Sequence, residues 1–156
     1  MIKKTIFSLF ILFLLISQLH AFTVGMGGNK IDYYNQAKKK IIKANIFEKK
    51  GKLKKANNLY DQALSYLYKA NKEKPSDPNI YGYLGFVLNK KGNLIDAEIY
   101  YKLGLEINPT HIKINKYAGE LYVKTNRVNK AKERLNALKN CGCEEFNELN
   151  ALIKIK

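Results

Sequence analysis

The chain has 156 residues, with 28 Lys and Arg against 13 Asp and Glu, so its formal net charge is +15 at pH 7. Such a charge attracts anions over long distances without selecting one kind. After residue 21 the sequence holds one histidine, His111, two serines, Ser65 and Ser76, and two cysteines, Cys141 and Cys143. This supply is too thin for a nucleophile–His–acid catalytic set or a four-ligand zinc site, so we predict no enzymatic activity and no cofactor.

The first 21 residues are predicted to be a bacterial-type secretory signal peptide. Lys3 and Lys4 precede an almost continuous apolar run over residues 5–17, and Ala21 provides a small residue at the cut. The run is shorter than the about 20 residues that a membrane-spanning helix needs, although an uncleaved anchor is the alternative. We therefore expect export to the periplasm, with membrane contact only through this segment if it stays attached. Cleavage removes two lysines and no acid, which lowers the net charge from +15 to +13.

Residues 22–31 form a glycine-rich stretch without periodicity, which is typical of a short flexible arm. From Ile31 onward apolar residues recur at helical spacing, and no strand pattern is present. The helical pattern is interrupted at Gly51, residues 74–78, Gly92, residues 109–110, Asn126 and Gly142. Helical segments separated by short turns predict an all-α fold.

The helical segments repeat with a period of 34 residues. The matching positions are Gly92 with Asn126, Ala97 with Ala131 and Tyr101 with Leu135. The first unit carries seven extra residues, because its turn glycine, Gly51, precedes Gly92 by 41 positions while Pro75 precedes Pro109 by 34. Seven residues are close to two helical turns of about 3.6 residues each, so they leave the buried face in register. We therefore expect one long helix over residues 52–73.

This pattern resembles the tetratricopeptide repeat, in which a small residue lies in the first helix, glycine at the turn, alanine and an aromatic in the second helix, and proline at the end. The match is best over residues 78–110, at Tyr81, Leu84, Gly85, Gly92, Ala97, Tyr101 and Pro109. The resemblance implies a short right-handed superhelical solenoid of three helix–turn–helix repeats, at residues 32–77, 78–110 and 111–143.

Residues 144–156 do not begin another repeat. Phe146, Leu149, Leu152 and Ile155 recur every three residues with polar groups between them. One apolar and one polar face is what a terminal helix needs to close an open stack. We predict a capping helix that buries these four side chains.

Cys141, Gly142 and Cys143 form the one unusual local motif. By the 34-residue shift Cys143 takes the place of Pro109, which puts the motif in the turn before the capping helix. Two cysteines in an oxidising compartment are expected to pair, so we predict a local disulfide that replaces the proline. A redox-active pair or a soft-metal site, for example for copper(I), is the alternative.

The resemblance also implies a peptide-binding groove along the first helix of each repeat. The family's groove positions correspond here to Ile41, Asn45, Glu48, Asn79, Gly82, Phe86, Asn89, Lys90, Lys113, Lys116, Glu120 and Lys124. Some members hold a peptide's terminal carboxylate with a Lys–Asn–Asn–Lys–Arg set. Because Ile41, Tyr83 and Tyr117 occupy three of those five places here, we do not predict that clamp.

We therefore predict an exported interaction module or scaffold that binds a protein or peptide in the cell envelope. The excess of lysine in the groove favours an acidic segment with an apolar anchor. Nucleic acid is not expected as a partner, because the chain is exported. The alternatives are a redox or metal-handling protein that uses Cys141 and Cys143, and a binder of anionic envelope lipid or polymer.

Overall fold

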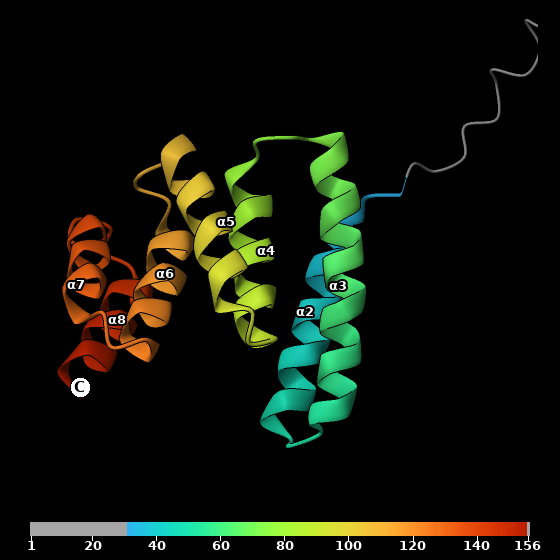
Figure 1. The fold of residues 1–156 in the computed structure, drawn as a ribbon, viewed down its shortest axis with the longest axis horizontal. Helices are drawn as coiled ribbons and strands as arrows, with labels where there is room; N and C mark the ends of the chain where they lie inside the picture. Colours follow the sequence, from blue (N-terminus) through green and yellow to red (C-terminus); the bar gives the residue numbers. More distant parts are fainter. Residues whose placement is uncertain (1–30, 156) are drawn as a thin grey trace, which may run out of the picture. The chain divides into compact units, whose positions relative to one another are not determined.

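The computed structural model describes residues 31–155, which form an all-α fold (Figure 1). The predicted signal segment and nearly all of the predicted arm lie outside the described residues. In chain order the helices are α2 (Tyr33–Lys49), α3 (Leu53–Glu73), α4 (Pro78–Lys90), α5 (Leu94–Ile107), α6 (Ile112–Lys124), α7 (Val128–Ala137) and α8 (Glu144–Lys154). None of these helices is both long enough and apolar enough to cross a membrane. The predicted all-α class is confirmed.

Short polar side chains start several of these helices. The Asp32 carboxylate accepts a hydrogen bond from the backbone N–H of Asn35 at 3.0 Å, and the Asp77 carboxylate accepts one from Asn79 at 2.8 Å. Such caps satisfy backbone donors that have no partner inside the helix, and each stabilises the fold by about 1 kcal/mol. The sequence thereby defines where α2 and α4 begin.

The turns after α2, α4 and α6 share one backbone feature. Each contains a residue with positive φ: Gly51 at 68°, Gly92 at 83° and Asn126 at 57°. Glycine and asparagine adopt this left-handed conformation at the lowest cost, which explains why the repeat keeps these residue types. After the first turn, α3 runs unbroken from Leu53 to Glu73, so the seven extra residues lengthen the helix as predicted.

The helices pack as successive pairs, α2 with α3, α4 with α5 and α6 with α7 (Figure 1). Neighbouring pairs meet through α3 and α4, through α5 and α6, and through the first helices α4 and α6. The last helix, α8, packs against both α6 and α7. The first helices of the pairs therefore lie along one side of the stack.

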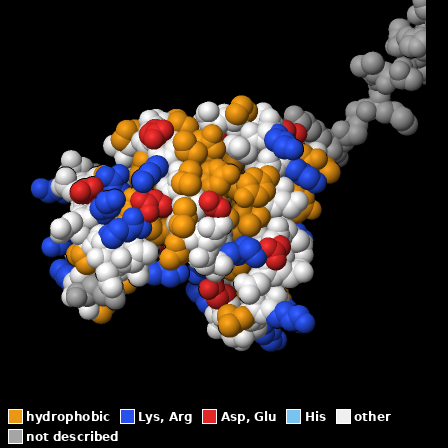
Figure 2. Space-filling view, viewed as in Figure 1, with side chains coloured by type: hydrophobic (Ala, Val, Ile, Leu, Met, Phe, Trp, Pro, Cys, Tyr) orange, Lys and Arg blue, Asp and Glu red, His pale blue; other side chains and the backbone are white. Residues whose placement is uncertain are grey.

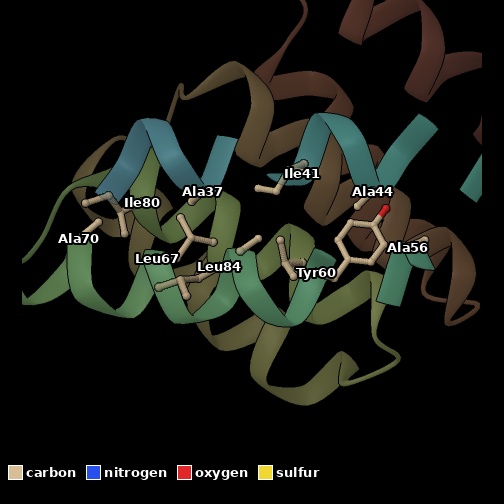
Figure 3. Packing of buried hydrophobic residues seen from close by; sticks show 11 residues of the cluster. Ala37, Ile41, Ala44, Ala56, Tyr60, Leu67, Ala70, Ile80 and Leu84 are labelled. Atoms are coloured by element: carbon tan, nitrogen blue, oxygen red, sulfur yellow. The ribbon is translucent and has the colours of Figure 1, made fainter. Parts of the chain in front are cut away.

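The core of the first half of the stack lies between α2, α3 and α4. Ala37, Ile41 and Ala44 of α2 face Tyr60 and other buried residues of α3 (Figure 3). Small residues on α2 let the two helices approach closely, and the larger residues fill the remaining space. Burying one large apolar side chain contributes about 1.5–3 kcal/mol, so this cluster provides much of the stability of the first pair.

The capping helix buries only part of the face predicted for it. Leu149 is fully buried, and Ile153 packs against the core of the last pair. Leu152 is 36% exposed and Ile155 is 83% exposed, so their predicted burial is wrong. A step of three residues falls short of a full helical turn of about 3.6 residues, so repeated steps of three move successive side chains away from the buried side of the helix. A step of four, from Leu149 to Ile153, brings the side chain back to the buried side.

Candidate functional site

A pocket of about 500 Å³ opens among the first helices of the three pairs. It is lined by residues of α2 and α4, by the turn after α5, and by the first two turns of α6. The lining residues are Tyr34, Lys38, Asn79, Gly82, Tyr83, Asn108, Thr110, His111, Ile112, Lys113 and Tyr117. Because three separate helices contribute, the pocket exists only when the pairs are stacked.

Three tyrosines, one from each first helix, provide the pocket's apolar surface. The rings of Tyr34 and Tyr83 meet edge to face, with centroids 5.8 Å apart. Tyr117 extends the aromatic surface onto α6. Burial raises the pKa of Tyr34 and Tyr117 to about 12, so both hydroxyls stay protonated and can donate hydrogen bonds near neutral pH. The pocket can therefore hold an apolar or aromatic group and still satisfy polar atoms beside it.

Two lysines give the pocket its charge. The Lys38 ammonium lies 5.5 Å from the centre of the Tyr34 ring, and Lys113 is exposed at the start of α6. Neither lysine forms an ion pair with another described residue. No Asp or Glu lines the pocket. An anionic group of a ligand would therefore meet two unpaired cations in the lining, with the nearest carboxylates, Asp32 and Asp77, outside it.

His111 connects the pocket to the start of α6. Its Nδ1 accepts a hydrogen bond from the Ile114 backbone N–H at 3.3 Å, which leaves the proton on Nε2, 3.3 Å from the Asn79 Oδ1. Burial lowers the pKa of His111, which favours this neutral form. The imidazole thus caps α6 and contacts Asn79 of α4.

The structure brings together only part of the groove predicted from the sequence. Asn79, Gly82 and Lys113 line the pocket. Ile41 is 4% exposed and lies in the core between α2 and α3, so its assignment to the groove is wrong. Ala37, Ile41 and Ala44 form the buried stripe of α2.

Asn45, Glu48 and Lys90 already have partners within the protein. The Tyr60 hydroxyl donates to the Asn45 Oδ1 at 2.7 Å or to the Glu48 Oε2 at 2.8 Å, and the Lys90 ammonium lies 2.9 Å from the same Glu48 carboxylate. Burial opposes ionisation of Glu48, but the hydrogen bonds from Lys90 and Tyr60 outweigh it and lower its pKa. This network joins α2, α3 and α4, so its first role is structural.

Lys116 is also occupied. Its ammonium lies 2.5 Å from Glu148 of α8 and 3.5 Å from Glu120 of α6. Burial raises the pKa of Glu120 above its usual value even with Lys116 nearby. Lys124 lies 3.5 Å from the Asn89 side-chain oxygen. Of the four lysines predicted in the groove, only Lys113 is both unpaired and at the pocket.

Phe86 is half-buried between α4 and α6. Its ring lies 4.8 Å from that of Tyr117, and the Lys90 ammonium lies 5.7 Å from its centre. The ring packs against the core of the first two pairs. Phe86 therefore supports the wall beside the pocket and does not line the pocket itself.

Tyr34 and Lys38 are pocket residues that the sequence reasoning did not select. Lys38, Asn79 and Lys113 each lie thirteen residues before the positive-φ residue of their turn, Gly51, Gly92 and Asn126 respectively. Counting back from those turns would have placed Lys38 beside the two residues that were selected.

The Cys141 and Cys143 sulfur atoms lie at disulfide distance, with Cα atoms 5.1 Å apart, in the turn before α8. Gly142 has a φ of 59°, a conformation that glycine adopts freely. Among residues 31–155 no group of three or more His, Cys, Asp or Glu side chains is placed to hold a metal ion. The motif lies at the end of the stack, and none of its residues lines the pocket.

The second helices of the pairs carry a separate apolar surface. Figure 2 shows a band of hydrophobic side chains over α3 and α5. Exposed large hydrophobic residues on these two helices include Tyr68 of α3, at 43% exposed, and Ile95 and Ile99 of α5, at 77% and 49%. Exposed apolar patches of this kind often mark contact surfaces.

No protein-family model and no curated protein sequence matches the chain. Solved structures do match it. The first TPR of Spaghetti (RPAP3), bound to the HSP90 peptide SRMEEVD, is 21% identical, with a TM-score of 0.55 over 82% of this chain and 98% of that one.

Two further matches agree. The second TPR domain of human RPAP3, in complex with the HSP70 peptide SGPTIEEVD, is 17% identical, with a TM-score of 0.55 over 80% of this chain and 99% of that one. The TPR2B domain of yeast Sti1, in its complex with pHsp70, is 14% identical, with a TM-score of 0.57 over 76% and 94%. At this identity the likeness establishes the fold, and the chain therefore has the fold of the tetratricopeptide-repeat domains, as its repeat pattern predicted.

Proposed function

We propose that this protein is an exported, non-catalytic interaction module that binds a peptide segment of another protein in the pocket between α2, α4 and α6. The observation that carries the proposal is the pocket's composition. Aromatic rings come from three helices, two unpaired lysines stand at its edge, and it contains no acid. The similar domains of RPAP3 were solved with peptides that contain consecutive glutamates, which supports a peptide as the class of ligand.

The pocket chemistry specifies the segment more closely. An aromatic or large apolar side chain fits against Tyr34, Tyr83 and Tyr117, and an acidic side chain beside it pairs with Lys38 or Lys113. Charge pairs at the rim chiefly raise the rate of association, whereas a buried aromatic anchor contributes most of the affinity. We therefore expect acidic segments with one aromatic anchor to bind best.

A peptide display library tests this proposal directly. Panning on purified residues 22–156 should enrich acidic peptides with an aromatic residue. Tyr83→Ala should weaken their binding by about 2 kcal/mol, the size expected for an anchor contact. Lys113→Glu should slow association and reduce its salt dependence. The matched controls are Tyr68→Ala and Lys132→Glu, which make the same changes on α3 and α7, away from the pocket.

Thermal melting of each variant separates a binding defect from an unfolded protein. Lys113 is exposed, so its variant is expected to fold even if Tyr83→Ala loosens the packing around α4. If folded Tyr83→Ala and Lys113→Glu proteins bind the enriched peptides as well as the controls do, the pocket is not the site.

Export rests on residues 1–21 and has its own test. N-terminal sequencing of the protein recovered from the periplasm of an expressing bacterium should begin at Phe22. If the chain is instead recovered in the membrane fraction with Met1 intact, the N-terminal segment is a membrane anchor and the protein is not a free periplasmic module.

A further inference from the structure

The end of the first helix pair, where α2 turns into α3, is the most basic segment of the fold. Residues 49–55 read KKGKLKK, so five lysines occupy seven positions. All five are exposed, and no acidic residue occurs between Lys49 and Tyr60. None of the five forms an ion pair with another described residue. These five lysines therefore face solvent without an ion-pair partner among the described residues.

The same segment exposes apolar surface. Leu53 is 61% exposed in the middle of the lysines, and Ile46, one turn before the end of α2, is 47% exposed. Beside them lies an open hollow of about 480 Å³, formed by Phe47 and Leu59 with Lys54, Lys55 and Asn58. The Lys55 ammonium lies 5.8 Å from the centre of the Phe47 ring. Apolar side chains and unpaired cations thus share one small area.

The α2–α3 hairpin also extends beyond the other helices. In Figure 1 its turn lies below the ends of α4 and α6, and Figure 2 shows Lys or Arg side chains on the same lobe. A projecting end can approach a flat surface without a collision from the rest of the stack.

We propose that this end of the α2–α3 hairpin, here called the basic tip, binds the surface of a bilayer that contains anionic phospholipid. The lysines match the phosphate-bearing headgroups, and Leu53 and the Phe47–Leu59 hollow accept the apolar region beneath them. A lysine near an anionic membrane surface strengthens binding by roughly fivefold, and the attraction fades within about 10 Å in salt. The proposal adds a membrane contact to the one expected of the N-terminal segment alone, and it does not depend on the peptide pocket.

Vesicle flotation with residues 32–156 tests the basic tip without the apolar N-terminal segment. This unit contains every buried core residue of the described chain and packs as one body, so it is expected to fold alone. It should float with phosphatidylcholine vesicles that contain phosphatidylglycerol and remain in solution with pure phosphatidylcholine. The combined change Lys50→Gln, Lys52→Gln and Lys54→Gln should weaken binding by at least about tenfold.

The matched control is the combined change Lys72→Gln, Lys132→Gln and Lys139→Gln, which removes the same charge from exposed positions elsewhere on the stack that form no ion pair with a described residue. It should lower binding by less than the tip variant. Leu53→Ser should weaken vesicle binding severalfold while leaving binding to the soluble polyanion polyphosphate unchanged.

Equal losses in the two triple variants would overturn the proposal, because net charge alone would then explain binding. The proposal would also be overturned if the wild type bound polyphosphate as tightly as vesicles and Leu53→Ser weakened neither interaction. The basic tip would then be a general site for polyanions. Tyr83→Ala should float like the wild type, which separates this test from that of the peptide pocket.

Discussion

The middle and last helix pairs differ in the side chain that packs against the buried glycine of the first helix. Gly85 of α4 and Gly119 of α6 lie 34 residues apart and are both buried. A Cβ atom at Gly85 would collide with the ring of Tyr101, which comes from α5, the partner helix of the same pair. A Cβ atom at Gly119 would collide with Leu149, which comes from α8. The repeat equivalent of Tyr101 in the last pair is Leu135, and Leu149 takes over the space above the glycine.

This difference shows why the stack ends with α8. In the middle pair one aromatic ring closes the gap between the two helices. In the last pair the smaller Leu135 does not take that place, and a residue from outside the repeat completes the packing. The last pair therefore depends on the capping helix for its core, whereas the middle pair carries its own filling residue.

The largest expected effect is on Leu149. Leu149→Ala removes a fully buried side chain and leaves a cavity over Gly119, so it should lower the free energy of unfolding by about 2–5 kcal/mol. Leu152→Ala, on the exposed side of α8, should change it by no more than about 0.5 kcal/mol. Urea denaturation followed by circular dichroism measures both. Similar values for the two variants would mean that α8 does not complete the last pair.

The turn that leads into α8 should have the next largest effect. Changing Cys141 and Cys143 together to Ser should lower stability by about 1–3 kcal/mol, because the loop that the disulfide closes is very short. Thermal melting of the variant, and of the wild type with and without reductant, measures this loss of stability. Peptide binding should not change, since the motif lies outside the pocket. A loss of binding at unchanged stability would instead favour redox or metal chemistry.

The two glycines themselves test the comparison. Gly85→Ala should destabilise the protein by about 1–3 kcal/mol, because the new Cβ meets a rigid ring and comes within 3.0 Å of the Ala97 carbonyl oxygen. Gly119→Ala meets only the flexible end of Leu149, and the better helix propensity of alanine offsets part of the cost. Denaturation midpoints should therefore rank wild type, then Gly119→Ala, then Gly85→Ala. The reverse order of the two variants would contradict the assignment of Tyr101 as the fixed filling residue.

The smallest expected effect concerns the caps of the two first helices. Asp77 caps α4 with a carboxylate, while His111 caps α6 with an imidazole that must stay neutral to accept the bond. The pKa of folded His111 lies below its usual value of 6.5, so the unfolded chain binds more protons in the range just below 6.5. Stability contributed by this cap is therefore complete above pH 6.5 and is lost as the pH falls through that range.

His111→Asn keeps a capping acceptor without the titrating ring. Melting temperatures measured above and below pH 6.5 should fall more for the wild type than for this variant. The test compares the pH dependence of the melting temperature between the wild type and the variant. The carboxylates titrate in both proteins, so their contribution cancels in this difference. Identical slopes would show that the ring nitrogen does not hold α6.

The sequence predicted the helices well, because their signals are local. Gly51, Gly92 and Asn126 end the first helices, and the seven extra residues of the first repeat, close to two helical turns, predicted that α3 is continuous. The site was predicted less well, because its geometry depends on contacts between distant segments. The sequence around Lys116 in α6 does not indicate that Glu148 of α8 forms an ion pair with it. Ile41 matches a family groove position, yet it lies in the buried stripe of α2.

The ion pair between Lys116 and Glu148 also couples helix α6 to the opening of the C-terminal end of the stack. Backbone amides exchange with solvent only when their helix opens, and the end of a stack opens more easily than its middle. Detachment of α8 uncovers Gly119 and frees Lys116 in one event. Amide protons along α6 should therefore exchange at a rate set by the departure of α8, and a ligand that engages the released Lys116 would speed that exchange instead of slowing it.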